Sequence, residues 1–189
     1  NPLKIHLKID TGMHRQGFLS NEIPQVIDSL KKLPKNIVVE GIYTHFPSAK
    51  DPKNSEETKA QLAVFKRARD AIITSGFSPV SHAAATAATL IYHESHFDMV
   101  RIGIGLYGLW PAQETRAAFG DKFNLKPILS WKTIISEVKK VPKNTKIGYG
   151  GSEITTRPTT IAVCPIGYWH GFPRSLSSKA FVLVQGKRC

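Results

Sequence analysis

Cysteine is scarce in this 189-residue sequence: only Cys164 and Cys189 are present, and their spacing matches no metal-binding motif. So few cysteines exclude a disulfide-rich fold, and we expect both thiols to be reduced. The sequence also lacks an apolar run of the roughly 18 residues that a membrane span requires, and we find no signal peptide. We therefore expect a cytoplasmic protein without a membrane partner.

Acidic residues are few relative to basic ones, with 14 aspartates and glutamates against 26 lysines and arginines, so that the formal net charge is +12. Such an excess is compatible with nucleic-acid binding. However, the basic residues are spread along the chain, many of them at polar positions of predicted helices, and no nucleic-acid motif accompanies them. The simpler interpretation is a solvated basic surface, and we predict no nucleic-acid partner.

Strand and helix patterns alternate over the first two-thirds of the sequence. Nearly continuous apolar strands separated by amphipathic helices are typical of a parallel sheet covered by helices, which is an α/β fold. The first helix has Ser20 as its expected N-cap and Pro24 in its first turn, where proline is tolerated. The expected strands are 5–9, 37–46, 80–84 and 97–107, and the expected helices are 20–33, 55–74 and a short one after residue 84.

After about residue 120 the pattern changes. Residues 129–141 alternate between apolar and polar, as an antiparallel strand with one solvent-exposed face does, and further strands are expected at 159–165 and 181–184. We therefore predict two domains, one covering residues 1–120 and a β-rich one covering residues 121–189. Because the first residues resemble an internal strand and the last ones an unfinished strand pair, we expect a piece of a larger enzyme.

Polar residues cluster where the predicted parallel strands end, which is where such folds bind ligands. Arg15 follows a tight glycine turn and would hold an anion or a cofactor oxygen, or else form a salt bridge with Asp10. His45 closes its strand and would act as a base, as a metal ligand or as a ring that stacks on a flat ligand, unless it simply belongs to the core. No second metal ligand lies at a suitable spacing from it.

Two further segments offer ligand-binding or catalytic groups. Thr86 starts a helix among small residues and would either bind a phosphate or serve as a plain helix cap. Arg101 lies in an apolar strand, so it must be paired or serve a ligand, and Gly103 lets backbone amides approach that ligand closely. Tyr149 and Tyr168 lie on glycine-flanked corners, as ordinary hairpin residues or as functional phenols.

Six segments occur in a fixed order along the chain: KIDTGMHRQGF, GIYTHF, HAAATAA, FDMVRIGIGLYGL, IGYGG and PIGYWHGFPRSLS, the last followed by FVLVQGKR. In these segments and their order the chain resembles alanine racemase, a fold-type III family that depends on pyridoxal 5′-phosphate, over essentially its whole length. The resemblance implies a (β/α)8 barrel followed by a mostly β domain. Residues 1–120 would form the later, cofactor-binding part of the barrel, and residues 121–189 the start of the truncated β domain.

The resemblance also implies roles near the substrate. Lys8 matches a lysine that is often carbamylated in the family and that positions Arg15. Arg15 would hydrogen-bond the phenolic oxygen of the cofactor and help to hold the substrate carboxylate. Tyr149 matches the catalytic tyrosine, which the family supplies across a homodimer interface to the partner's site, and Tyr168 matches a second interface tyrosine near the substrate.

Other residues would hold the cofactor itself. His45 would pack against its pyridine ring, and Thr86, with the backbone of Gly103 and Ile104, would bind its phosphate. Arg101 would face the pyridine nitrogen. Because arginine stays protonated, it disfavours protonation of that nitrogen and weakens the ring as an electron sink. A weak sink suits a racemase, since a fully stabilised carbanion would invite transamination.

The chain departs from the family pattern in three respects. No segment resembles the motif of the lysine that binds the cofactor covalently and acts as the second acid/base group, so we expect the chain alone to be inactive. Ala85 stands where the family usually has asparagine, and Trp169 and His170 replace a usual alanine–aspartate pair. The family's C-terminal tyrosine and its methionine–aspartate substrate contacts lie beyond residue 189.

The implied reaction is the interconversion of L-alanine and D-alanine by two opposed acid/base groups, which supplies D-alanine for bacterial peptidoglycan. A serine or broad-spectrum amino-acid racemase of the same family remains an alternative, as does a non-catalytic module that binds pyridoxal phosphate. A decarboxylase of this fold type would favour an acidic partner for the pyridine nitrogen, which Arg101 argues against. Tyr149 argues against a module without chemistry, because its implied use is proton transfer.

Overall fold

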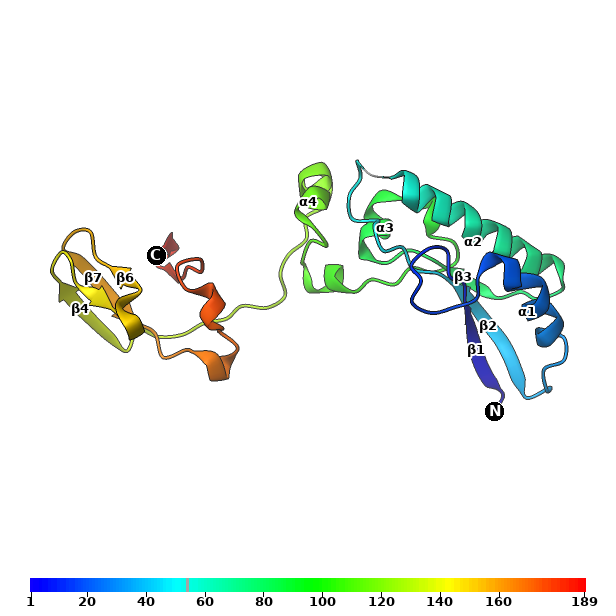
Figure 1. The fold of residues 1–189 in the computed structure, drawn as a ribbon, viewed down its shortest axis with the longest axis horizontal. Coiled ribbons are helices and arrows are strands. Elements are labelled where there is room, and N and C mark those ends of the chain that lie inside the picture. The colour runs from blue at the N-terminus through cyan, green and yellow to red at the C-terminus, as the bar shows by residue number, and fades with distance from the viewer. Residues whose placement is uncertain (54) are drawn as a thin grey trace. The chain divides into compact units, whose positions relative to one another are not determined.

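The computed structural model describes residues 1–53 and 55–189, which form two compact units, Asn1–Leu129 and Ser130–Cys189 (Figure 1). The first unit contains a parallel sheet with helices, and the second contains only short antiparallel strand pairs and turns. The domain boundary at 120/121 stays a prediction for the complete protein.

The sheet of the first unit has three parallel strands in the order β1-β2-β3, where β1 is Leu3–Lys8, β2 is Ile37–Tyr43 and β3 is Val80–His82. Helix α1, Ile23–Leu30, connects β1 to β2, and helix α2, Glu56–Thr74, connects β2 to β3 (Figure 1). The remaining elements of this unit are short: η1 Ser20–Glu22, α3 Thr86–Ile91, η2 His93–Ser95, η3 Ile104–Tyr107 and α4 Gln113–Phe119.

The hydrophobic core lies between the sheet and its two long helices. Ile9 and Ile42 from the strand side are fully buried, as are Phe65 and Ile72 from α2. Full burial of such a side chain stabilises the fold by about 1.5 to 3 kcal/mol. The helix predicted at 55–74 is therefore confirmed, and its buried face is the predicted one. Gly76 follows its C-terminal end with a left-handed backbone conformation (φ +100).

The opposite face of the sheet is polar. Successive strand residues point to opposite faces, so β1 directs Leu7 toward the helices and its neighbours away from them. The residues on the far side contact one another through hydrogen bonds, an ion pair, a cation–π contact and ring stacking. We call this surface the polar face; its members are Lys4, His6, Lys8, Glu40, Tyr43 and His82.

Two local predictions for this unit are wrong. Instead of a strand at 97–107, only an isolated bridge joins Arg101 to Ala85, because Gly103 then turns the chain and η3 follows. Ser20 is not a helix N-cap. It begins η1, where the side chain of Glu22 accepts the Leu19 N–H at 2.7 Å.

The second unit is built from three antiparallel pairs. Strand β4, Glu137–Val141, confirms the antiparallel prediction, but it covers only the end of the predicted 129–141, because the preceding residues have no strand partner among those described. The pairs are β4 with β7 Thr159–Val163, β5 Lys146–Ile147 with β6 Glu153–Ile154, and β8 Leu183–Val184 with β9 Lys187–Arg188. The turns η4 Tyr149–Gly151, η5 Tyr168–His170 and η6 Arg174–Leu176 lie between them.

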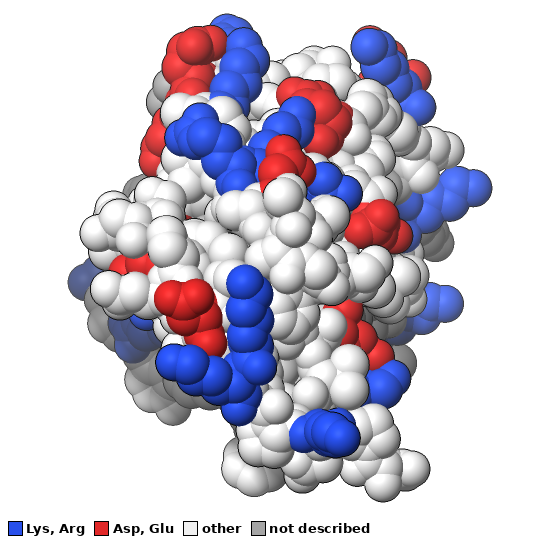
Figure 2. All heavy atoms as spheres, turned by 90° about the vertical axis from the view of Figure 1, so that its right-hand side faces the viewer, with Lys and Arg blue, Asp and Glu red and all other residues white. Residues whose placement is uncertain are grey.

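The surface carries charges of both signs. On the side that Figure 2 presents, lysine and arginine side chains are interleaved with aspartate and glutamate. Some are paired, as Lys59 is with Glu56 at 3.1 Å on α2. Within the part of the chain that the structure describes, no helix is both long enough and apolar enough to cross a membrane.

Candidate active site

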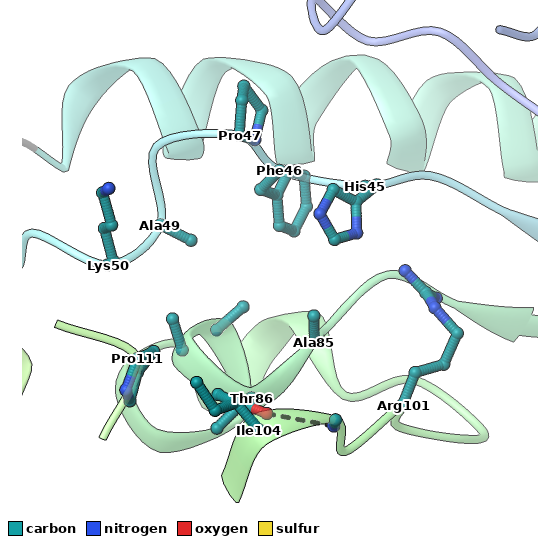
Figure 3. A pocket seen from close by; sticks show the side chains of 13 residues that line it. His45, Phe46, Pro47, Ala49, Lys50, Ala85, Thr86, Arg101, Ile104 and Pro111 are labelled. Atoms are coloured by element: carbon teal, nitrogen blue, oxygen red, sulfur yellow. Dashed lines mark hydrogen bonds between the residues drawn. The ribbon is translucent and has the colours of Figure 1, made fainter. Parts of the chain in front are cut away.

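A cavity of about 400 Å³ lies just beyond the carboxyl ends of β2 and β3. Figure 3 shows its two walls: His45 lies on the loop that follows β2, and Thr86 and Ile104 lie opposite on α3 and η3. Arg101 and Gly103 also line it. The structure thus brings together five of the predicted cofactor-binding residues, although they are separated by up to about sixty positions in the sequence.

Arg101 is fixed by four acceptors. One guanidinium nitrogen, Nη1, donates to the His82 Nδ1 atom at 2.7 Å and to the His82 carbonyl at 3.1 Å. The other, Nη2, donates to the carbonyls of Thr44 at 2.7 Å and Ala83 at 3.1 Å. Burial lowers the pKa of the guanidinium, but arginine stays charged at any working pH. No described residue accepts from its Nε, so this donor remains available to a ligand in the cavity.

His82 is the residue of this site whose role sequence reasoning missed. Its ring is 4% exposed and stacks on Tyr43, with centroids 5.0 Å apart and planes 7° apart. Burial, followed by the charges of Arg101 and His6, lowers the pKa of His82 to about 4. His82 is therefore neutral at pH 7, and its unprotonated Nδ1 can accept from Arg101.

We expect the free energy of unfolding to decrease as the pH falls from about 6.5, the ordinary pKa of histidine, to about 4, the pKa of folded His82. In that window the unfolded chain binds a proton that the folded chain excludes, so acid favours unfolding. Urea unfolding followed by circular dichroism at several pH values would measure this. His82→Gln should flatten the dependence, whereas His93→Gln, at an exposed position of η2, should not. An unchanged slope in His82→Gln would contradict the assignment.

Thr86 is not a plain helix cap. It is the first residue of α3, it is 6% exposed, and its hydroxyl accepts the N–H groups of Gly103 at 3.1 Å and Gly105 at 3.3 Å. This contact folds the 103–105 turn against the helix start and shapes that end of the cavity. A Cβ added at Gly103 would meet no atom within 4 Å, which leaves open space beside the turn for a ligand group.

His45 lines the cavity with a partly buried ring. Burial, then the charges of Arg101, Lys8 and Arg15, lowers its pKa, so the imidazole is neutral at pH 7. Among the residues that the structure describes, no three histidine, cysteine, aspartate or glutamate side chains are grouped to hold a metal.

Lys8 and Arg15 lie at the end of β1 and in the loop that follows it. The Lys8 Nζ atom is buried without a hydrogen-bond partner, and burial is the main cause that lowers its pKa. Asp10 pairs not with Arg15 but with the N–H groups of Gly12 and His14, both at 3.0 Å, and the salt bridge considered from sequence is absent from the described residues. Burial alone would raise the pKa of Asp10, but these hydrogen bonds and His14 lower it.

Tyr149 and Tyr168 lie in the second unit and are 91% and 70% exposed. Tyr149 is flanked by glycines in the left-handed region, Gly148 (φ +71) and Gly150 (φ +72), which present the phenol on a tight corner. Trp169, next to Tyr168, is 96% exposed. The roles that the family resemblance implies for both tyrosines stay predictions.

Known sequences and structures resemble both units. The alanine racemase N-terminal domain family matches residues 1–111, and the alanine racemase C-terminal domain family matches residues 128–189. An alanine racemase of Leptospira interrogans is 42% identical over 98% of this chain and 48% of its own length, and one of Methanococcus maripaludis is 41% identical over the same shares. The chain thus spans about half the length of the curated relatives that it matches.

Solved structures give the same result. The biosynthetic alanine racemase of Pseudomonas aeruginosa superposes with a TM-score of 0.84 at 32% identity, covering 99% of this chain and 49% of that one. The alanine racemase of Bacillus anthracis with bound L-Ala-P superposes with a TM-score of 0.82 at 33% identity, covering 99% and 48%.

Proposed function

The chain belongs to the alanine racemase family and has its α/β fold, part of a TIM-type barrel followed by a β domain; from this premise we propose that it forms part of an enzyme that interconverts L-alanine and D-alanine with pyridoxal 5′-phosphate. The observation that carries the proposal is the cavity in which His45, Thr86 and Arg101 converge. We also propose that the complete enzyme is a homodimer and that it is located in the cytoplasm.

The cavity has the donors that this cofactor requires. Arg101 lines the cavity with a permanent charge and an Nε–H donor that no described residue accepts, and we propose that it meets the pyridine nitrogen. The turn held by Thr86 leaves open space beside Gly103 for the phosphate, and His45 offers a neutral ring for packing. When bound, pyridoxal phosphate withdraws electrons from the substrate Cα, and Arg101 limits that withdrawal because it cannot give up a proton.

Lys8 and Arg15 are proposed to hold the substrate side of the site. The burial that lowers the pKa of Lys8 enlarges its neutral, nucleophilic fraction. A neutral amine can attack carbon dioxide, form an N–C bond and release one proton to give a carbamate. The resulting carbamate would replace the buried, unpartnered ammonium with an anion whose two oxygens accept hydrogen bonds, and it would draw the guanidinium of Arg15 toward the cavity.

Proton transfer is assigned to Tyr149. Racemisation needs a proton removed from one face of Cα and another delivered to the opposite face, which requires two opposed groups. Tyr149, exposed on its glycine corner, would serve one face in the partner subunit, and Tyr168 would lie near the substrate. No segment of these 189 residues resembles the motif of the lysine that would serve the other face.

A chimera tests the proposed function. Residues 1–189 would replace the aligned segment of the Leptospira interrogans alanine racemase, to which they are 42% identical. We expect the chimera to racemise alanine in both directions when supplied with pyridoxal phosphate. A folded chimera that binds the cofactor but racemises no amino acid would contradict the proposal, and a clear preference for serine would move the assignment to the serine or broad-spectrum alternative.

Thr86→Val should weaken the phosphate site. The substitution removes the acceptor of two part-buried backbone N–H groups, and the loss of one such hydrogen bond costs about 0.5 to 1.5 kcal/mol. We expect the affinity for pyridoxine 5′-phosphate, measured by calorimetry, to fall roughly tenfold. Thr86→Ser should retain it. Thr89→Val, which removes a hydroxyl that donates to the Ala85 carbonyl of the same helix, is the matched control, and equal affinities for all three would exclude Thr86 from the phosphate site.

A further inference from the structure

A row of hydrogen bonds crosses the polar face and ends at Arg101. Beyond the contact of Arg101 with His82 Nδ1, the Nε2 atom of His82 lies 2.9 Å from Nδ1 of His6. The Nε2 atom of His6 lies 3.4 Å from Oε2 of Glu40. We call these four residues the relay. It joins β1, β2 and β3 to the wall of the cavity.

The number of protons allows only one arrangement of the relay. Arg101 can only donate and the Glu40 carboxylate can only accept, so three links need one proton from the arginine and one from each imidazole. Both histidines must then be neutral and protonated at Nε2. If His82 carried a proton on Nδ1, either as a second proton or in place of the one on Nε2, that N–H would face the N–H of Arg101 Nη1. Two donors cannot form a hydrogen bond, so the contact with Arg101 would be lost.

Independent features support this arrangement. The Lys4 ammonium donates to the other oxygen of Glu40 at 2.5 Å and lowers the pKa of that carboxyl, which keeps it an acceptor. Gly41 lies under the imidazole of His6, and a Cβ at this position would collide with His6 Nδ1. Burial and the charge of Arg101 itself disfavour a second proton on His82.

The location of the relay also requires an explanation. In a (β/α)8 barrel the face of the sheet opposite the helices forms the interior, which branched aliphatic residues usually fill. Here that face carries two histidines and a carboxylate in direct succession. Polar groups in such a place are retained when they are fully connected to one another.

We propose that His6 and Glu40 are positioning residues, which hold His82 as the neutral Nε2–H tautomer and thereby keep Arg101 aligned on the cavity. Glu40 fixes the proton of His6, His6 fixes the proton of His82, and the bare Nδ1 of His82 anchors Arg101. The inference rests on the proposed function only for the ligand that Arg101 meets, because the tautomers are a property of the chain itself.

Nitrogen-15 NMR of the histidine-labelled chain at pH 7 tests the tautomers directly. We expect the rings of His6 and His82 each to show a protonated Nε2 and an unprotonated Nδ1, with signals assigned through His6→Gln and His82→Gln. A His82 ring that carries its proton on Nδ1, or protons on both nitrogens, would overturn the proposal.

Two variants separate positioning from a merely structural role. Glu40→Gln removes the charge at the end of the relay but keeps the side-chain shape, and we expect the tautomer ratio of His6 to change about fivefold. Gly41→Ala should displace the His6 ring and change the His82 tautomers without altering any titratable group. Glu56→Gln, at an exposed ion pair on α2, is the control that leaves both rings unchanged. Lower stability with unchanged tautomers in both test variants would reduce the relay to a structural role and refute the proposal.

Binding of pyridoxine 5′-phosphate, which has the pyridine nitrogen and the phosphate but no aldehyde, distinguishes this inference from the proposed function. We expect Glu40→Gln to lower its affinity roughly 2- to 10-fold. If neither the wild-type chain nor any variant binds pyridoxine 5′-phosphate while His6 and His82 have the expected tautomers, the proposed cofactor is contradicted and the relay is supported. If the wild-type chain binds it while His82 is not the Nε2–H tautomer, the relay alone is overturned.

Discussion

Tyr149→Phe is expected to lower the racemisation rate of the chimera by roughly 10²- to 10⁴-fold, the usual contribution of a positioned acid/base group. Phenylalanine keeps the ring on its glycine corner and removes only the hydroxyl. Because Tyr149 is proposed to serve one face of Cα, exchange of the α-hydrogen with solvent should be lost for one enantiomer of alanine and retained for the other.

Deuterium exchange followed by proton NMR, with each enantiomer supplied separately, measures this asymmetry. Tyr107→Phe, at an exposed tyrosine of the first unit for which no role is proposed, is the matched control and should exchange both enantiomers. Equal loss of exchange from both enantiomers would assign Tyr149 a structural role. Near-wild-type racemisation would remove it from the mechanism.

Arg101→Met is expected to lower the free energy of unfolding of the chain by about 2 to 4 kcal/mol, because buried acceptors would lose their donors. The carbonyls of Thr44, Ala83 and His82 belong to residues that are 0%, 0% and 4% exposed, so water cannot replace the guanidinium freely. We also expect binding of pyridoxine 5′-phosphate to be lost, since the group proposed to face the pyridine nitrogen is gone.

Urea unfolding and calorimetry check both effects. Arg101→Lys keeps the positive charge but lacks the planar guanidinium with its several N–H donors. Its free energy of unfolding and its affinity for pyridoxine 5′-phosphate should therefore lie between those of Arg101→Met and the wild type. Arg67→Met, at an exposed arginine of α2, should leave both measurements unchanged. Tight binding by Arg101→Met would place the pyridine nitrogen elsewhere.

Much of the first unit could be predicted from the sequence because its signals are local. The period of Leu62, Phe65 and Ile72 identifies α2 and its buried face. A short apolar-rich segment identifies β1, and a β-branched run identifies β2. The convergence of His45, Thr86 and Arg101 follows from one rule, that parallel strands end at the same edge of a sheet.

The remaining features depend on contacts between distant segments. Residues 97–107 have the composition of a strand. They do not extend the sheet, because the Thr86 hydroxyl accepts the N–H groups of Gly103 and Gly105 and holds residues 103–105 in a turn. The relay was missed because His6, Glu40 and His82 lie on three different strands and meet only through the register of the sheet, with its shift between Ile5 and His6. In sequence, the three lie far apart and no motif connects them.

The polar face has a calorimetric consequence. Hydration of apolar surface raises the heat capacity by about 0.45 cal/mol/K per Å² on unfolding, whereas hydration of polar surface lowers it by about 0.26. Lys8 and His82 are buried on this face, where a barrel usually has branched aliphatic residues, so the fold should unfold with a smaller heat-capacity increment. Its stability curve would be flatter, so cooling or warming away from the temperature of maximum stability would weaken the fold more gradually than in a barrel filled with hydrocarbon.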